Sequence, residues 1–469
     1  MKKYLFPILL LAPFILTASS RTIWVTRWDY STPSDIEKII ENAVNLEFDK
    51  ILFQVRGNGT VAYPSQYETW SKQFNEIDPG WDPLQCAITK AHRNNIELHA
   101  WINVYPGWHG PAPPENQNQL YHKHPSWFAV NMLGNPQVLN DNYMWLSPTH
   151  PDVKRHILKI CKELLLQYDI DGIHLDYCRY PGQTYSYDER SIQLFESIYQ
   201  DSPQNILFSW RNWRQRAVTE LITSIHNMIR AERPTVCLSA AVIGDLYRGE
   251  KLFLQETDVW MRRGIIDAVY PMIYTEDMYS FKYLVKSYLE KKHNCRVYAG
   301  IYLYQADQLR DQLNFAVKAG CHGTAVFSYD RLASDHIINP IFAEQLRFSE
   351  QRVPPVLPPF IEQLKTIPAN IHRGEPFRIA VKLESCYICD CDKSQAPVLV
   401  VDQVWPPLYP QQLSMSPVVE SDRWLVSEQS VIMNADQLQC GLIACTNCRT
   451  GLQDYYQNSG PIWSIQAEN

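Results

Sequence analysis

The 469-residue sequence lacks three features that would indicate nucleic acid, nucleotides or a membrane span. It has no basic run, and 43 Lys and Arg against 50 Asp and Glu give a formal net charge of −7 at pH 7, so we expect no nucleic-acid partner. It has no Gly-rich phosphate-binding loop. Beyond the first 20 residues, no stretch approaches the roughly 18 continuous apolar residues that a membrane span needs.

Metal-binding signatures are scarce as well. The HExxH signature of zinc hydrolases is absent, and the 13 His residues are scattered along the chain. His174, Asp176 and Cys178 are potential ligands, as are His99 and His109, but scattered His residues are more often structural. We therefore expect no metal and no cofactor.

The first 20 residues have the layout of a signal peptide. Two lysines precede the apolar run 5–16, and small residues follow it at 18–20. This order is typical of secretory signals. A buried first strand or helix is the alternative. We expect residues 1–20 to be removed, and the exported chain to lie in the periplasm or cell envelope.

The 12 cysteines form two groups. The scattered group comprises Cys86, Cys161, Cys178, Cys237, Cys295 and Cys321. The bunched group, near the C-terminus, comprises Cys386, Cys389, Cys391, Cys440, Cys445 and Cys448. In an exported protein the bunched group favours disulfides. Zinc held by C-x-x-C pairs is the alternative, and the spacing does not reveal the pairing.

Short apolar runs alternate with helical patterns from Thr22 to about Phe348. The runs, which we expect to be strands, are 22–26, 50–55, 96–104, 171–177, 236–242, 266–274, 296–303 and 323–329. Such alternation suggests an α/β fold, a parallel (β/α)8 or TIM barrel. A doubly wound open sheet is the main rival, but the Gly-rich first turn of many such sheets is missing.

Helix signals and proline content give the domain limits. Residues 32–46 offer Thr32 or Ser34 as a helix cap, and a later helical pattern ends at Gly320. We expect the barrel to occupy residues 21–348. A Pro-rich linker at 349–360 follows. Short alternating runs then predict a small, sandwich-like, Cys-rich β domain over 361–469.

The stretch DGIHLDYCRYP, residues 171–181, carries unusual side chains for an internal strand. Chemistry in such barrels lies at the carboxyl ends of the strands. Period-two alternation places His174, Asp176 and Cys178 on the inner side, with Asp176 at the mouth. A buried unpaired carboxylate is costly, so we expect a nearby Arg to keep Asp176 ionised. Arg56 and Arg179 are the candidates. A salt bridge to Arg179 that only shapes the loop is the alternative.

This stretch also resembles a known family. Together with IELHAWINVYPG before it and DAVYPMIY after it, it is similar to the glycosyl-hydrolase-like family 10 over about residues 22–345. The resemblance implies a (β/α)8 barrel and an exported glycosidase. It also implies action on cell-envelope glycan, including peptidoglycan strands stripped of their peptides. Asp176 matches the acidic residue of the family's strand-four motif, whereas Cys178 stands where an apolar residue is common.

Carboxylates, cations and aromatic rings on one rim suit carbohydrate chemistry, because rings stack on sugars and carboxyl groups act on the glycosidic oxygen. We predict a glycoside hydrolase of an envelope polysaccharide, with Asp176 as nucleophile or transition-state carboxylate and Glu276 as general acid/base. The reserve acids are Asp277, Asp245 and Asp330. The predicted substrate-binding residues are Trp28, Arg56, Trp101, Asn103, His174, Arg179, Tyr274 and Tyr302.

Two other function classes stay open at this stage. One is a non-catalytic glycan-binding envelope protein that kept the barrel and lost turnover. The other is a structural envelope protein whose Cys clusters cross-link its partners. Release of reducing ends from glycan strands separates the enzyme from both.

Overall fold

The computed structural model describes residues 19–334 and 337–348, and beyond them the backbone of a set of strands between Ile361 and Gln466. The chain divides into two compact units, and Ser19–Arg352 is one of them. The predicted signal peptide lies outside the described residues except for its last two, and so does the predicted linker at 349–360. Among the described residues, no helix has the length and apolar character that crossing a bilayer requires.

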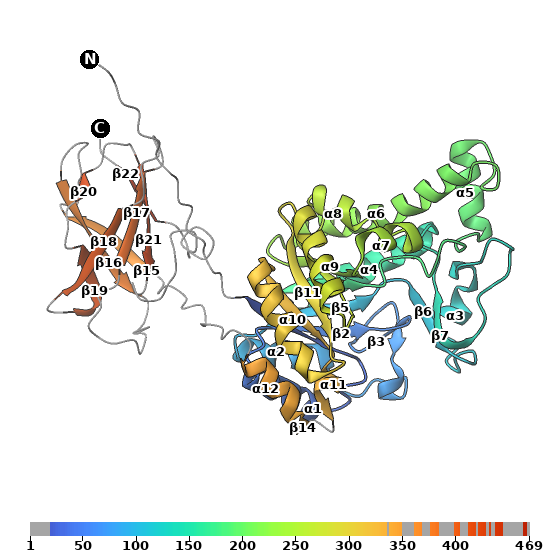
Figure 1. Ribbon diagram of the computed structural model, residues 1–469, viewed down its shortest axis with the longest axis horizontal. Helices are drawn as coiled ribbons and strands as arrows, with labels where there is room; N and C mark the ends of the chain where they lie inside the picture. Colours follow the sequence, from blue (N-terminus) through green and yellow to red (C-terminus); the bar gives the residue numbers. More distant parts are fainter. Residues whose placement is uncertain are drawn as a thin grey trace, which may run out of the picture. The chain divides into compact units, whose positions relative to one another are not determined.

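Eight parallel strands in the described residues form a closed barrel (Figure 1). They are β1 (Ser20–Val25), β2 (Lys50–Arg56), β5 (Glu97–Asn103), β8 (Gly172–Asp176), β9 (Cys237–Ile243), β10 (Ala268–Met272), β11 (Arg296–Tyr302) and β12 (Gly323–Phe327). Each strand pairs with the next in this order, and β1 also pairs with β12. The predicted strands and the TIM barrel are confirmed, and the open sheet is excluded.

Helices return the chain from one strand to the next. They are α1 (Pro33–Asn45), α2 (Pro83–Arg93), α3 (Leu120–Lys123), α4 (Pro151–Gln167), α5 (Glu189–Tyr199), α6 (Leu207–Glu232), α7 (Leu246–Phe253), α8 (Thr257–Arg262), α9 (Met278–Lys291), α10 (Ala306–Ala319), α11 (Tyr329–Leu332) and α12 (Pro340–Phe348). Short elements complete this unit: β3 (Thr60–Val61), β4 (Thr69–Trp70), β13 (Ala333–Ser334), β14 (Ile337–Ile338) and the 3-10 turns Lys72–Phe74 and Pro125–Trp127.

The helix ends follow from local chemistry. Thr32 caps α1: its hydroxyl accepts the N–H of Asp35, and the Asp35 carboxylate accepts the N–H of Thr32. This reciprocal capping box satisfies backbone donors that have no partner within the helix. At the other end of the barrel sequence, α10 stops at Gly320, whose φ of 93° favours glycine.

Two layers of side chains hold the barrel together. The larger layer lies between strands and helices, as in the packing of Ile36, Ile39 and Ile40 of α1. The smaller layer fills the barrel interior with Trp24, Leu52, Trp101, Ala241, Ala268, Tyr270, Tyr298 and Ala325. The interior is therefore a packed core, and any binding site must lie above it.

The connection between β5 and α4 is a long insertion. It carries β6 (Pro106–Gly110) and β7 (Asn140–Trp145), which pair as an antiparallel hairpin, and α3. Figure 1 shows these three elements together on one side of the barrel unit. The alternating pattern of the sequence did not predict this hairpin.

The other unit contains β15 (Ile361–Ile367), β16 (Pro376–Leu383), β17 (Val398–Gln403), β18 (Gln411–Val418), β19 (Ser421–Ser427), β20 (Val431–Ile432), β21 (Gln437–Ile443) and β22 (Trp463–Gln466). They pair antiparallel in the order β15-β16-β19-β18-β17-β21-β22, with β20 beside β16. The sandwich-like form stays a prediction. The side chains of the bunched cysteines lie outside the described residues, so their oxidation stays a prediction too.

Candidate active site

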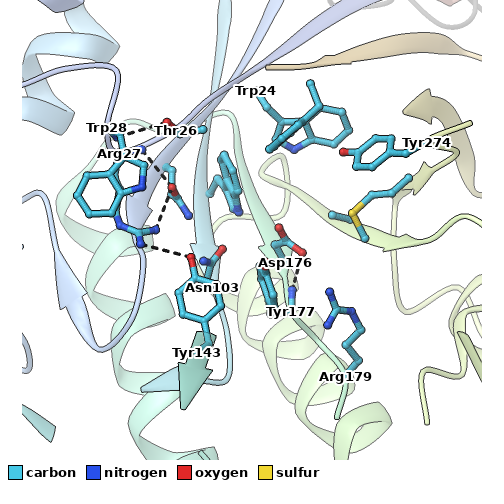
Figure 2. A pocket seen from close by; sticks show the side chains of 15 residues that line it. Trp24, Thr26, Arg27, Trp28, Asn103, Tyr143, Asp176, Tyr177, Arg179 and Tyr274 are labelled. Atoms are coloured by element: carbon cyan, nitrogen blue, oxygen red, sulfur yellow. Dashed lines mark hydrogen bonds between the residues drawn. The ribbon is translucent and has the colours of Figure 1, made fainter. Parts of the chain in front are cut away.

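A cavity of about 340 Å³ opens at the carboxyl ends of the barrel strands (Figure 2). It is lined by Trp24, Thr26, Arg27, Trp28, Gln54, Trp101, Asn103, Tyr143, Asp176, Tyr177, Arg179, Ala241, Met272, Tyr274 and Phe327. The lining includes six of the predicted site residues: Trp28, Trp101, Asn103, Asp176, Arg179 and Tyr274. The strand-end rule therefore identified residues on more than one side of the cavity.

Asp176 is the last residue of β8 and is only 7% exposed. Burial raises the pKa of its carboxyl to about 6, which outweighs the opposing effects of the Arg179 charge and of the Tyr177 N–H, 2.6 Å from Oδ1. The charge of Arg179 favours the ionised carboxyl, as expected, but its effect on the pKa is smaller than that of desolvation. A carboxyl that titrates near neutral pH can both give and take a proton, as a general acid/base must.

The chain turns sharply directly after Asp176. Tyr177 has a φ of 54°, in the left-handed region that few non-glycine residues adopt. This turn ends the alternation of β8, so Cys178 does not share the inner side with Asp176. Cys178 is fully buried in the core between strands and helices. Its predicted inward placement is therefore wrong, while Arg179 lines the cavity.

His174 supports the floor of the cavity from below. The indole N–H of Trp24 donates to its Nε2 over 3.1 Å, and its Nδ1 lies 2.9 Å from the Ser239 hydroxyl. Because Nε2 accepts this hydrogen bond, the ring proton is on Nδ1 and the ring is neutral. Burial lowers the pKa of His174 well below its usual range. His174 is fully buried and outside the cavity lining, contrary to its predicted binding role.

Asn103 presents an amide to the cavity. It is the last residue of β5, is 1% exposed and pairs in register with Asp176. Neither its Oδ1 nor its Nδ2 has a hydrogen-bond partner among the described residues. A buried amide without partners is costly, so the cavity holds a donor and an acceptor suited to a ligand.

Arg56 was predicted to meet the substrate, but it lies behind the cavity. A β-bulge between Gln54 and Arg56 shifts the pairing of β2 with β5, so Arg56 faces outward. Its buried guanidinium bonds Glu68 at 2.7–3.0 Å and donates to the carbonyl oxygens of Asn103 and Val104. Arg56 therefore fixes the end of β5 instead of touching a ligand.

Glu68 completes this buried anchor. Its Oε1 lies 2.8 Å from Nε2 of His156, on α4. Burial alone would raise the pKa of Glu68, but the charge of Arg56 and the contact with His156 hold it at about 2. The ion pair thus joins β2, the segment after it and α4 on the outer side of the barrel.

Arg27 and Tyr143 form one wall of the cavity. The Arg27 guanidinium donates to Gln54 Oε1 and to the Tyr143 hydroxyl, each at 3.3 Å, and lies 4.4 Å from the Trp28 ring centre. Figure 2 shows Arg27 beside Trp28, with its hydrogen bond to Tyr143 as a dashed line. A Cβ on Gly57 would come within 2.6 Å of the guanidinium, so a larger residue there would displace the Arg27 side chain. Trp28 itself is 59% exposed at the rim.

The opposite side contains Arg179, surrounded by aromatic rings. Its guanidinium carbon lies 4.6 Å from the ring centre of Tyr177, 5.4 Å from that of Trp145 and 5.5 Å from that of Phe253. Such distances are typical of cation–π contacts. The Trp145 ring comes from the hairpin insertion, so this part of the site depends on both the barrel and the insertion.

Comparison with known proteins agrees with this arrangement. Residues 19–315 match the glycosyl hydrolase-like 10 family. The chain belongs to this family. Among characterised relatives, glycosyl hydrolase YngK of Bacillus subtilis is 26% identical over 264 residues, which cover 50% of this chain and 48% of that protein. The match thus spans about half the length of YngK. Glycosyl hydrolase DigH of Escherichia coli K12 is 23% identical over 338 residues, covering 62% of this chain and 73% of DigH.

Solved structures of glycoside hydrolases share the fold of this chain. The PgaB glycoside hydrolase domain of Bordetella bronchiseptica aligns with a TM-score of 0.52 and 14% identity, over 68% of this chain and 97% of that domain. The α-L-fucosidase isoenzyme 2 of Paenibacillus thiaminolyticus aligns with a TM-score of 0.53 and 14% identity, over 70% of this chain and 48% of that enzyme. At such identities the likeness concerns the fold alone.

The other predicted acids of this glycosyl hydrolase-like 10 barrel lie outside the cavity lining. Glu276 is exposed and accepts a bond from a glutamine side chain. Asp277 and Asp245 accept backbone N–H groups at the starts of α9 and α7, and Asp330 accepts a serine hydroxyl. Among the described residues that line the cavity, Asp176 is the one carboxyl.

Two further residues lie next to the lining. Tyr302, predicted to bind substrate, lies behind the lining residue Phe327: the two rings stack with their centres 5.9 Å apart, and the Tyr302 hydroxyl accepts a hydrogen bond from Arg331. Asp29, which is not among the predicted site residues, lies shortly after β1. Burial raises its pKa to about 7, and the nearby charge of Asp330 adds to this. Its position just past a strand was the available signal.

Several lining residues escaped the sequence prediction. Arg27 and Gln54 lie near the ends of β1 and β2, where the strand-end rule points, but they are not among the predicted binding residues. Tyr177 lies inside the quoted motif, but period-two alternation predicts that its side chain points outward. Tyr143 comes from the hairpin insertion, and no periodic pattern in the sequence indicated that this segment reaches the cavity.

Proposed function

We propose that this chain is an exported glycoside hydrolase in which Asp176 is the catalytic carboxyl. One observation carries the proposal: a desolvated carboxyl with a pKa of about 6 lies at the end of β8, inside a cavity lined by aromatic rings and an amide. Such a group can protonate a glycosidic oxygen near neutral pH. Membership of a glycosyl hydrolase-like family supports the same reaction class.

The second catalytic group, in this proposal, comes from the substrate. Most glycosidases use two carboxyl groups across the scissile bond, and Asp176 is the one that lines the described cavity. In substrate-assisted glycosidases, a 2-acetamido group of the sugar acts as the nucleophile. Its carbonyl oxygen attacks the anomeric carbon while Asp176 protonates the leaving oxygen. The unpartnered amide of Asn103 is suited to orient that acetamido group.

The proposed substrate is an envelope polysaccharide built from such sugars, with peptidoglycan glycan strands as the specific candidate. The family resemblance and the signal-peptide pattern support this substrate and a location in the periplasm or cell envelope. We further propose that the bunched C-terminal cysteines are oxidised there. Peptide mapping without reductant should reveal linked peptides from 386–391 and 440–448, whereas reduced thiols with stoichiometric zinc would contradict this.

The test is digestion of peptide-free glycan strands, with the products identified by mass spectrometry. The parent should release oligosaccharides with new reducing ends, and Asp176→Asn should release almost none. Glu276→Gln serves as the comparison, because this residue lies outside the cavity lining. If Glu276→Gln loses as much activity as Asp176→Asn, the proposed assignment of roles is wrong.

A non-catalytic glycan-binding protein is the second candidate. It is favoured by one observation, the presence of a single carboxyl among the described residues that line the cavity. Saturable binding of glycan strands by the parent, without any release of reducing ends, would support this candidate over the enzyme.

A further inference from the structure

The guanidinium of Arg179 is placed in the cavity without an anionic partner in contact. The residue is half-buried and lines the cavity beside Asp176. Its buried Nε has no hydrogen-bond partner, and none of the ion pairs within 4.0 Å among the described residues includes Arg179. Its contacts are the faces of three aromatic rings, from Tyr177, Trp145 and Phe253.

Other buried arginines of this unit each have a guanidinium group engaged in a hydrogen bond, although Nε of Arg214 also lacks a partner. Arg56 bonds Glu68, Arg27 bonds Gln54 and Tyr143, and Arg214 donates to two backbone carbonyl oxygens. A partly buried charge without such partners is unfavourable, and cation–π contacts offset only part of the cost. The N–H groups of Arg179 are therefore available to a ligand.

Asp176 is not the anionic partner of Arg179. It feels the charge of Arg179, but its Oδ1 accepts the backbone N–H of Tyr177, and no ion pair joins the two side chains. Figure 2 shows the guanidinium directed toward the cavity below the carboxyl. A ligand in the cavity can thus contact the acid and the guanidinium at once.

We propose that Arg179 binds a carboxylate carried by the sugar substrate, so that this site selects acidic glycans over neutral ones. The inference rests on the proposed function, and names the substrate class of the same cavity. A planar guanidinium held between rings pairs with a planar carboxylate through two parallel hydrogen bonds. Two sources share this chemistry: a lactyl ether on the sugar, and the ring carboxylate of a uronic acid.

A carboxylate fits the site better than a phosphate. The other cation of the lining, Arg27, is already bonded to Gln54 and Tyr143. The cavity also contains the Asp176 carboxyl. A dianionic group would meet one available cation and a nearby acid, whereas a single carboxylate matches the single guanidinium.

The experiment measures binding by calorimetry in an Asp176→Asn background, where turnover is removed. The ligands are peptide-free peptidoglycan strands, the same strands with their carboxylates amidated, oligogalacturonate, and neutral chitin oligosaccharides. We expect at least one acidic glycan to bind about tenfold more tightly than its neutral counterpart. Arg179→Met should abolish that preference, and Arg179→Lys should retain part of it. Arg93→Met, which removes an exposed charge at the end of α2, should leave it unchanged.

The outcomes separate the inference from the proposed function. Equal binding of acidic and neutral glycans by the Arg179-containing protein overturns the inference, even if the parent hydrolyses both. A preference that survives Arg179→Met also overturns it. A preference that depends on Arg179, in a parent that cleaves neither glycan, supports the inference while the proposed hydrolase activity fails. The comparison of ligands needs no variant at Arg179, so misfolding of Arg179→Met does not obscure it.

Discussion

Asn103 and Asp176 are register partners at the carboxyl ends of neighbouring strands, β5 and β8. Their side chains therefore enter the cavity at the same level. The amide has neither donor nor acceptor engaged within the described residues, and the carboxyl titrates near neutral pH. Together they offer one ligand a donor, an acceptor and an exchangeable proton.

Asn103→Ala should lower kcat/KM for glycan strands by about 10–100-fold, because a ligand group loses hydrogen bonds worth about 1–3 kcal/mol. The folded protein should lose little stability, since the buried amide has no partner to give up. Steady-state kinetics and thermal melts on one preparation check both expectations. A variant with lower stability but full activity would show that the amide serves the fold.

The pH–rate profile should report Asp176 directly. With a pKa of about 6, a general acid loses its proton as pH rises through 6, so kcat/KM should fall above that pH. Arg179, the phenols of Tyr177 and Tyr274 and the thiol of Cys178 are charged or titratable groups that interact electrostatically with it. The profile of the slow Asp176→Asn variant should lack this limb. A limb that persists in the variant would belong to another group.

Asp176→Asn should also stabilise the fold at neutral pH. The folded-state pKa of about 6 exceeds the ordinary value of 3.8, so the parent loses stability as pH rises from about 4 to about 6 and regains none above it. The variant avoids this cost, which is on the order of 3 kcal/mol for a shift from 3.8 to about 6. Chemical denaturation at pH 7 should show the gain, and at pH 4 it should nearly vanish. An equal gain at both pH values would rule out ionisation as its cause.

Glu68 should show the opposite pH dependence. Arg56 and His156 hold its pKa at about 2 in the folded chain, below the ordinary 4.5. Its stabilising contribution is therefore present above about pH 4.5 and is lost as pH falls toward 2. Glu68→Gln should cost about 3 kcal/mol at pH 7, because it leaves the Arg56 charge buried. Glu41→Gln, in an exposed pair with Lys38, is the control and should change the melting temperature little.

The barrel was predictable because its signals are local and repeated. Each run of alternating or apolar residues had the length of a strand, and caps such as Thr32 and Gly320 marked the helix ends. The inner side of a strand follows from the same alternation, which is why Trp101, Asn103 and Asp176 were placed correctly at the mouth.

The failures arise where the backbone departs from that alternation. The bulge before Arg56 and the left-handed turn at Tyr177 each reverse the side on which the next residue lies. Neither irregularity has a distinctive residue type, so periodicity alone does not reveal it. The contribution of Tyr143 depends on how an insertion folds over the barrel, which is a tertiary property that a one-dimensional pattern does not contain.

The pairing of β1 with β12 has a consequence for how the protein is made. Ile23 pairs with Val326, so the first and last strands of the barrel meet only after nearly the whole barrel sequence has been synthesised. Trp28 and Phe327 lie on either side of this seam and both line the cavity. Contacts between such distant segments form late in folding. A nascent or truncated chain that ends before β12 therefore has an incomplete cavity. It also exposes an open sheet edge, which is prone to pair with other chains.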